Sequence, residues 1–457
     1  MLVVLLALLA LVAAALLAEA RSSVRVPGTG RIRLTPFASL VGVFLLSIVL
    51  PSVYLVDSNT NSAFLPLAAG LGIIVGFALV ATARSDGSNF GIDVLDDKYW
   101  RRVLRGAWLL FGFLTALSLF RYDGIPPIID STIESLSGGD ARQIAADTSL
   151  RRLELTKGAW FDSETSGIAG TLGPVVRTAW PFLVTMLLAG RLNAPTTALR
   201  KRFRTLLVLA VPLGMLFVAG DYVRSGIVWG ILFVLAGYSL LRPVRPRIVG
   251  ILMVTLLIVF SGVTLLSYKG SQSSDQQLRN VTIGRFDDNY SNDVLIYEAV
   301  ESGIWELRLG GETMESLASA LPGVRAGVPV ALRVHQELRN GGYESTTFAS
   351  PTALGRLFLD WGFIGVLAGF AVLSAVSLQV GRLVQRWATR GSPVSVAVFG
   401  GATTAAGQAV LGGLVGFATS LTILFVLAVI AVALTGKRTH SLDDPRTAVD
   451  LVDSRST

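Results

Sequence analysis

The sequence predicts an all-α polytopic membrane protein, and three observations lead to that prediction. Hydrophobic residues make up 52% of the 457-residue chain and charged residues only 15%, whereas soluble proteins carry about 25% charged residues. The mean hydropathy is +0.62. The apolar residues gather into runs near the length of about 20 residues that a helix needs to cross a bilayer. We therefore expect a single transmembrane bundle over 1–439 and a polar, disordered tail at 440–457.

The apolar runs, taken in order, give about 11 transmembrane helices. They lie at 1–19, 36–56, 63–83, 106–120, 171–190, 205–220, 225–241, 248–267, 353–380, 393–415 and 417–435. The first run resembles a signal peptide, but it is longer than the hydrophobic region of such a peptide and no basic segment precedes it. We expect a retained helix whose N-terminus lies outside.

The basic residues predict which side of the membrane each loop faces. Most of the 39 lysines and arginines fall in one set of connections, at 21–33, 84–105, 191–204, 242–247, 382–390 and the tail after the last span. The opposite connections near 57–62 and 416 hold none. Because cytoplasmic loops carry the positive charge of membrane proteins, the first set and the C-terminus are expected in the cytoplasm. This bias explains the net charge of +8, so the charge does not indicate a nucleic-acid partner.

Two long outward segments, 121–170 and 268–352, keep arginines despite this rule. The second has helical periodicity in two pieces. One apolar face would hold Tyr297, Val300, Ile304 and Leu307, and the other Met314, Leu317, Ala318 and Leu321. We expect the two segments to form a helical extracytoplasmic cap on the mouth of the bundle.

Charged residues near the ends of spans are the first candidates for chemistry. Asp221 and Arg224 lie three apart between two short spans. They either pair and cap helix ends, or Arg224 points into an outward cavity and binds phosphate, to which a guanidinium is suited. Arg285 follows the eighth span, and the nearby Asp287, Asp288 and Asp293 favour a solvated turn with an N-cap.

The segment 325–344 carries the densest group of candidates. In a helix, His335 and Arg339 would share a face, and Arg333 would lie further round. A histidine near its ordinary pKa can accept a proton from a sugar hydroxyl, although a lone histidine on a polar loop is also typical of an ordinary surface. Glu344 is the alternative base, and Tyr343 could stack on a sugar ring.

Other features exclude several classes of chemistry. The chain has no cysteine and two histidines, so we expect neither a metal site nor a cofactor. Nucleotide-binding motifs are absent from the sequence. Arg356 and Asp360, four apart at the start of the ninth predicted span, are expected to form a helix-stabilising pair.

The layout and one passage resemble a known family. The passage STTFASPTALGRLFLDWGFIGVLAGF contains Ser350-Pro351 and then Leu359-Asp360-Trp361-Gly362, and Arg224-Ser225 precedes a mid-chain span. This pattern is similar to that of O-antigen and exopolysaccharide repeat-unit polymerases of the Wzy type, and more distantly to that of the O-antigen ligases. The resemblance implies a GT-C-like fold in the plasma (inner) membrane.

It further implies a metal-independent, inverting glycosyltransferase. Glycan would pass from a polyprenyl-diphosphate-linked oligosaccharide to a sugar hydroxyl of an incoming repeat unit, with membrane lipids, a flippase and a chain-length regulator as partners. The implied site consists of His335 as base with Glu344 as its substitute, Arg224 and Arg285 on the donor diphosphate, and Arg142, Arg333, Arg339 and Tyr343 on the substrates. A ligase with another acceptor is one alternative. A transporter, which would show inverted repeats and broken helices, is a second. A non-catalytic membrane scaffold, which would not need arginine-rich outer loops, is a third.

Overall fold

The computed structural model describes most of the helical part of the chain. The described residues are 25–26, 31–55, 61–81, 97–122, 124, 126, 129, 133, 137, 164–220, 224–242, 244–245, 247, 284–320, 330–339, 350–388 and 392–435. Two two-residue strands, β1 (Arg25–Val26) and β2 (Arg31–Ile32), pair antiparallel. Everything else regular in these ranges is helical, which confirms the predicted all-α class.

The helices fall into membrane-length elements and shorter ones. The longer set is α2 (Pro36–Phe44) continued by the π-helical turn η2 (Leu45–Val49) and α3 (Leu50–Leu55), then α4 (Phe64–Ala81), α5 (Asp97–Arg121), α8 (Glu164–Asn193), α9 (Thr197–Ala219), α10 (Arg224–Leu241), α16 (Ala353–Ala388) and α17 (Pro393–Thr435). The shorter set is α13 (Gly284–Glu301), α14 (Gly311–Ala320), α15 (Val330–Arg333) and the π-helical turn η4 (Val334–Leu338).

Five of these helices are long and apolar enough to cross a membrane. They are Pro36–Val53, Asp97–Arg121, Leu172–Asn193, Ala353–Trp387 and Pro393–Thr435, and two shorter apolar helices are Phe64–Val80 and Gly226–Leu241. Every predicted span within the described residues coincides with a helix, although α5 begins nine residues earlier than expected. The predicted spans 1–19 and 248–267 lie outside the described residues. The chain is thus a helical membrane protein.

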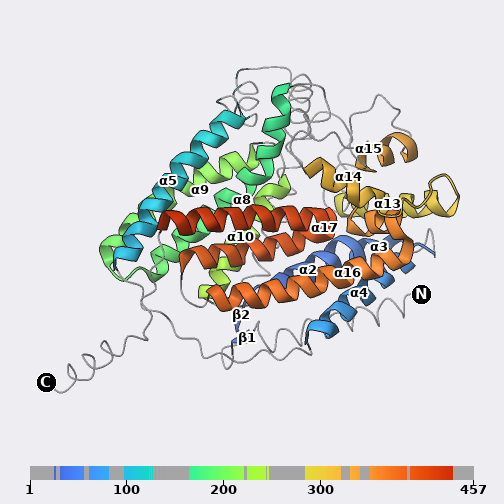
Figure 1. The fold of residues 1–457 in the computed structure, drawn as a ribbon, viewed down its shortest axis with the longest axis horizontal. Helices are drawn as coiled ribbons and strands as arrows, with labels where there is room; N and C mark the ends of the chain where they lie inside the picture. The colour runs from blue at the N-terminus through green and yellow to red at the C-terminus, as the bar shows by residue number, and fades with distance from the viewer. Residues whose placement is uncertain are drawn as a thin grey trace.

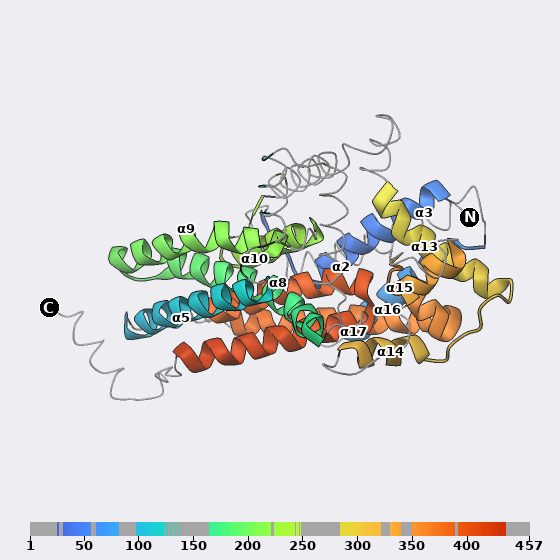
Figure 2. The ribbon, with the colours of Figure 1, turned by 90° about the horizontal axis from the view of Figure 1, so that it is seen from above.

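The membrane-length helices lie side by side along the longest axis of the molecule (Figures 1 and 2). At one end, Arg382 of α16 donates to the Val80 carbonyl of α4 over 2.9 Å. At the same end the Tyr99 hydroxyl meets Ser392, also at 2.9 Å, which joins the start of α5 to the start of α17. We call this the basic end.

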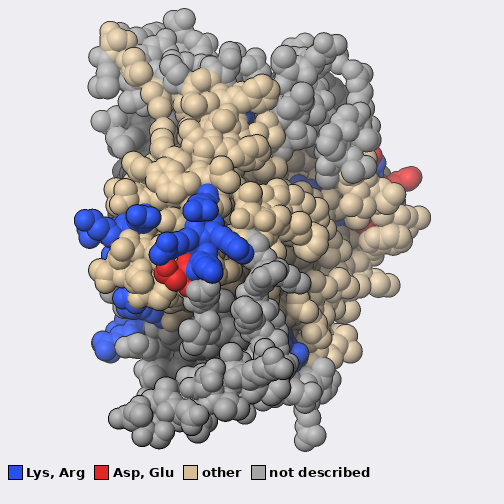
Figure 3. All heavy atoms as spheres, turned by 60° about the vertical axis from the view of Figure 1, so that its left-hand side comes forward, with Lys and Arg blue, Asp and Glu red and all other residues tan. Residues whose placement is uncertain are grey.

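The basic end carries the exposed cations of the bundle, as Figure 3 shows. At this end, the exposed cations among the described residues are Lys98, Arg101, Arg102, Arg105, Arg191, Arg200, Lys201, Arg202, Arg204, Arg242, Arg245, Arg247 and Arg386. The described parts of the predicted basic loops therefore gather on one face of the molecule, as their charge pattern predicts. Thr435, where α17 ends, lies at this end beside Gly106.

The opposite end, which we call the cap end, holds the short helices. Phe64 and Phe363 meet edge to face there with ring centroids 6.4 Å apart, and the Tyr122 hydroxyl donates to the Phe217 carbonyl over 2.8 Å. Figure 1 shows α13, α14 and α15 grouped at this end. Of the predicted cap, several residues between 123 and 136 and the ranges 138–163, 268–283, 321–329 and 340–349 lie outside the described part of the chain.

Two glycines turn long helices back on themselves at the cap end. Gly413 has φ 72° and ψ −171°, a conformation that is essentially restricted to glycine. The two halves of α17 then run antiparallel, because a side chain at Gly401 would meet Leu424 at 2.4 Å. The two predicted spans at 393–415 and 417–435 are these two halves.

The ninth predicted span is wrong at its start. Gly362, with φ 63° and ψ −152°, reverses the chain inside α16. The segment before it folds back along the segment after it, since Leu357 lies against Gly369. Residues 353–361 are therefore a short helix of the cap end, and the crossing helix begins after Gly362. The hydropathy pattern does not reveal this reversal, because Gly362 ends the first helix without lowering the hydropathy of the apolar run around it.

Helix α17 is the centre of the bundle and packs against α2, α5, α8, α10 and α16. The closest backbone approach joins α4 and α16. A side chain at Gly72 would come within 2.4 Å of the Leu367 carbonyl, and one at Gly76 within 2.1 Å of the Ala371 carbonyl. Small residues four apart allow such close packing, which drives helix association where lipid offers no hydrophobic gain.

Candidate functional site

A cavity of about 400 Å³ lies between α8, α10 and both halves of α17. Its volume falls within the range of sites that bind small molecules. The wall combines helix backbone at glycines with a few polar side chains, and the lining residues that carry the argument are Arg177, Thr178, Trp229, Thr404, Gln408 and Ser420.

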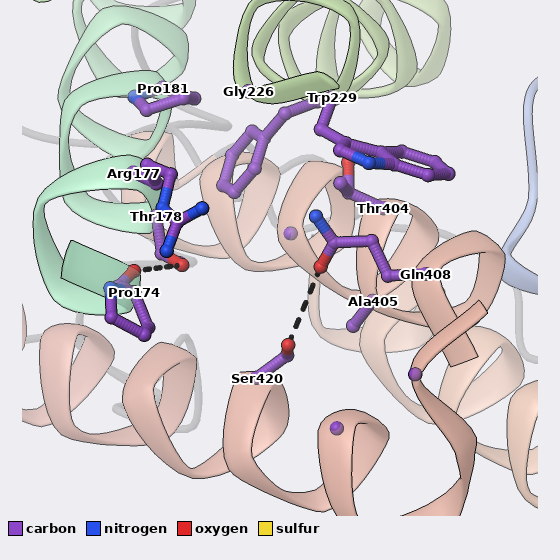
Figure 4. A pocket seen from close by; sticks show the side chains of 14 residues that line it. Pro174, Arg177, Thr178, Pro181, Gly226, Trp229, Thr404, Ala405, Gln408 and Ser420 are labelled. Atoms are coloured by element: carbon purple, nitrogen blue, oxygen red, sulfur yellow. Dashed lines mark hydrogen bonds between the residues drawn. The ribbon is translucent and has the colours of Figure 1, made fainter. Parts of the chain in front are cut away.

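Arg177 supplies the cation of this cavity. Its Nε donates to the Gly173 carbonyl over 3.2 Å, and the next residue, Thr178, donates to the Pro174 carbonyl over 2.8 Å. Across the cavity, the Ser420 hydroxyl donates to Gln408 over 3.5 Å. In Figure 4 the side chains of Arg177 and Gln408 both extend into the cavity from opposite walls. The wall thus offers a guanidinium, an amide and hydroxyls.

Two helix N-termini add positive potential to the same cavity. Helix α10 begins at Arg224, and Gly226 in its first turn lines the wall. The second half of α17 begins after the reversal at Gly413, and Gly416 in its first turn also lines the wall. The backbone N–H groups of a first helical turn carry partial positive charge. Together with Arg177 they make the cavity suited to an anion.

The predicted site residues lie on several elements. Arg224 stands two residues before Gly226 at the start of α10, and Arg285 lies in the first turn of α13. The side chains of both arginines lie outside the described residues. Arg142, Tyr343 and Glu344 also lie outside them. The predicted Asp221–Arg224 pair is not described for the same reason.

The segment with His335 forms α15 and the π-helical turn η4. The turn closes with the Arg339 amide donating to the Val334 carbonyl over 3.0 Å, so the helix ends here, as the glycines after it predict. Val334 is fully buried against the bundle, His335 is half-buried and Arg339 is exposed.

Arg333 has partners of its own within the cap. Its guanidinium stacks over the Trp305 ring at 4.6 Å and pairs with Glu337 at 3.4 Å. Glu337 also accepts from the Trp305 Nε1 over 2.8 Å. The three mutual contacts of Arg333, Glu337 and Trp305 hold η4, the turn that contains His335, against the loop after α13. Arg333 contacts Trp305 in the loop after α13, and η4 as an element packs against α13. Arg333, His335 and Arg339 are not among the residues that line the cavity.

Asp293 is a buried helix cap, and the predicted solvated turn is wrong for this residue. The side chain is fully buried in α13 and accepts from the Thr352 amide at 2.8 Å, the Thr352 hydroxyl at 2.6 Å and the Gly355 amide at 3.1 Å. It therefore caps the N-terminus of α16. Burial raises the pKa of Asp293 to about 7, against the opposing effect of its bonds to Thr352.

Asp360 and Arg356 do not pair with each other, contrary to the sequence prediction. Asp360 is fully buried and caps α14 by accepting from the Glu312 amide at 2.8 Å and the Thr313 amide at 2.9 Å. Arg356 lies 3.7 Å from the Glu312 carboxylate instead. Both residues have partners more than 40 positions away in sequence, which a rule about neighbours on one helix cannot find.

Glu312 is the second carboxyl group with a displaced pKa. Burial raises the pKa of Glu312 to about 7, while Arg356 opposes the rise. Arg308 lies 3.7 Å from it and also pairs with Glu315. No group of three His, Asp or Glu side chains able to hold a metal ion occurs among the described residues.

The sequence prediction missed the cation that lines the cavity. Arg177 stands inside the apolar run 171–190, where an ionisable residue usually marks a function, and that signal was available. Arg121, at the end of α5, is buried and lies against Gly173 on the same part of α8.

No protein-family model, no curated protein and no solved structure matches the chain.

Proposed function

We propose that the chain is a glycosyltransferase of the membrane that polymerises lipid-linked oligosaccharide repeat units. The glycan would leave a polyprenyl-diphosphate donor and pass, with inversion, to a hydroxyl of the next repeat unit. The observation that carries the proposal is the cavity at the cap end, where Arg177 and the first turns of α10 and α17's second half favour an anion. A diphosphate inside a membrane protein needs such a counter-charge.

The roles follow from chemistry. Arg177 and Arg224 would hold the diphosphate and offset the charge that develops on it as the sugar leaves. Gln408 and Thr404 offer hydrogen bonds to phosphate or sugar oxygens. His335 remains the proposed base, with Glu344 as its substitute. Arg142, Arg285 and Arg339 remain proposed substrate ligands.

The charge pattern supports an orientation for this reaction. Under the positive-inside rule the basic end faces the cytoplasm, and the cavity and cap then face outward. That is the side on which repeat units joined to a lipid carrier would be polymerised. The proposed location is the plasma membrane, with the C-terminus inside.

Reconstitution with a polyprenyl-diphosphate-linked repeat unit tests the proposal. We expect polymer from the wild type, and a rate reduced about 10- to 100-fold by Arg177→Gln or Arg224→Gln, since a hydrogen bond to a charged group contributes about 1.5–3 kcal/mol. Arg101→Gln, an exposed site at the basic end, is the matched control and keeps the wild-type rate. Equal rates for all four proteins would refute the proposed site.

The acceptor separates polymerase from ligase. A second lipid-linked repeat unit as acceptor identifies a polymerase, whereas transfer only to a different acceptor lipid identifies a ligase. His335→Gln and Glu344→Gln are compared in the same assay over a range of pH. Only the variant that lacks the base should lose the pH dependence of the rate that the base produces.

A transporter is the second candidate because α16 and α17 are interrupted at Gly362 and Gly413. Transporters use such breaks in the middle of the membrane. Here the break in α17 separates two halves that are each long enough to cross, so it is a turn between spans. Flux of the lipid-linked unit without polymer formation would favour the transporter.

A further inference from the structure

The cap end carries a surface whose exposed side chains are apolar. It consists of Ile304, Leu307, Leu309, Met314 and Leu317, from α14 and the loop before it, and we call it the cap apolar surface. Leu309 is 71% and Ile304 69% exposed. Except for Leu309, these residues belong to the two apolar faces predicted for the cap, and the structure leaves them exposed while it buries Tyr297 of the first face. Large exposed apolar surfaces in a folded chain mark contact with another apolar phase.

Helix α14 turns apolar side chains outward and a carboxylate inward, which is the opposite of the arrangement expected for a surface helix in water. Its outward face carries Met314 and Leu317. Its inward face carries Glu312, which is 3% exposed and lies between Arg308 and Arg356. A surface helix in water keeps its carboxylates outside, whereas in hydrocarbon the charged groups turn into the protein and pair.

The cap apolar surface is continuous with the lipid-facing side of a membrane span. The Arg308 amide donates to the Leu359 carbonyl over 2.8 Å, which fastens the loop to α16. A side chain at Gly310 would come within 2.8 Å of the Trp361 ring. Trp361 is half exposed just before the reversal at Gly362, and Ile364, at the start of the crossing helix, is 79% exposed.

The backbone conformation of Leu309 is a second, independent indication that the cap apolar surface does not face water. Its φ is +49°, a region that is costly for residues other than glycine, asparagine and aspartate. The side chain that this conformation turns outward is one of the most exposed apolar groups of the described residues. In water such a leucine would be unfavourable twice over, through its backbone and through its exposure.

We propose that the cap apolar surface is inserted into the membrane leaflet at the cap end, so that α14 is an interfacial anchor rather than part of a water-exposed lid. The exposed Glu301 and Glu306 mark the boundary with water. An amphipathic helix buries its apolar face about 5–10 Å into the headgroup and acyl boundary, which matches side chains that adjoin the end of a span. This inference depends on the membrane location and is independent of glycan transfer.

Single-cysteine labelling tests the proposal directly, because the chain has no cysteine. Leu309→Cys and Met314→Cys are labelled with an environment-sensitive fluorophore in the full-length protein, which is reconstituted in phosphatidylcholine–phosphatidylglycerol vesicles. Ile364→Cys is the membrane control and Ser302→Cys the water control. Quenching by nitroxide attached to the lipid is compared with quenching by iodide in the buffer.

We expect labels at 309 and 314 to be quenched by lipid nitroxide to at least half the extent seen at 364, and to show several-fold less iodide quenching than the label at 302. Iodide quenching equal to that at 302 would overturn the proposal and make α14 part of a water-exposed lid. Protection from both quenchers would overturn it too, in favour of a second copy or another protein on this surface. Size-exclusion profiles matching the wild type establish that each variant is folded.

Discussion

The Asp360 carboxylate should hold α14 in place, and Asp360→Ala is the sharpest test of how the cap is attached. The side chain is fully buried and accepts from two backbone amides, at Glu312 and Thr313, and from the Thr313 hydroxyl at 2.5 Å. Removal of the acceptor leaves a buried donor at Glu312 without a partner, which costs about 1–3 kcal/mol. Loss of a helix N-cap costs about 0.5–2 kcal/mol.

The two costs overlap, so we expect local destabilisation of α14 by about 3 kcal/mol. A change of that size corresponds to an increase of about 100-fold in the local opening equilibrium. Hydrogen exchange measured by mass spectrometry should then show amides of α14 exchanging about 100-fold faster, because exchange follows local opening. Peptides from α13 and the first half of α17 should keep their wild-type rates.

Thr313→Val is the matched control, since it removes the hydroxyl and keeps both backbone bonds to Asp360. We expect a loss of about 1 kcal/mol, an increase in exchange of about fivefold. Wild-type exchange of α14 in Asp360→Ala would refute the anchoring role. Faster exchange throughout the protein would show that the effect of Asp360 is not local to α14 and that this residue stabilises the whole bundle.

The remaining predictions concern the backbone and the buried acid. Gly76→Val should lower the melting temperature by several degrees in a detergent melt, because its Cβ would lie 2.1 Å from the Ala371 carbonyl. Gly413→Ala should cost about 1–3 kcal/mol in the same measurement, whereas Gly412→Ala, with open space around it, should not. Asp293 has a folded pKa of about 7 against 3.8 for the ordinary group, so the folded state binds more protons between those values and stability should fall as pH rises from about 4 to 7. Asp293→Asn should flatten that dependence by about 1 kcal/mol or more across pH 5–8.

The spans were predictable because bilayer thickness imposes a length on apolar runs. The two halves of α17 show this best, as the turn at Gly413 falls three residues before the predicted connection near 416. Helix α5 shows the limit of the method. Its first turns carry Arg101, Arg102 and Arg105, so a hydropathy pattern begins the span at 106 although the helix begins at Asp97.

The attachments of the cap were not predictable from local spacing. Asp293 is 59 residues from Thr352, and Asp360 is 47 residues from Thr313. Each carboxylate caps a helix that is distant in the sequence, so the pattern near the residue holds no trace of its role. The same limit applies to Arg356, which has its partner on α14. Periodicity also left the direction of the apolar face of α14 open, because it reports that a helix has two faces and not which of them meets the protein.

The two buried aspartates constrain how a substrate could reach the cavity. Asp293 fixes the start of the short helix 353–361 to α13, and Asp360 near its end fixes α14, while Gly362 folds that helix back on its own span. Displacement of α13 or α14 would therefore expose at least one buried carboxylate and the amides that it caps, at a cost of several kcal/mol. The cavity lies elsewhere, between α8, α10 and α17. We therefore expect the proposed lipid-linked substrate to enter between membrane helices, with these parts of the cap fixed in place, rather than by the opening of a lid formed by α13 and α14.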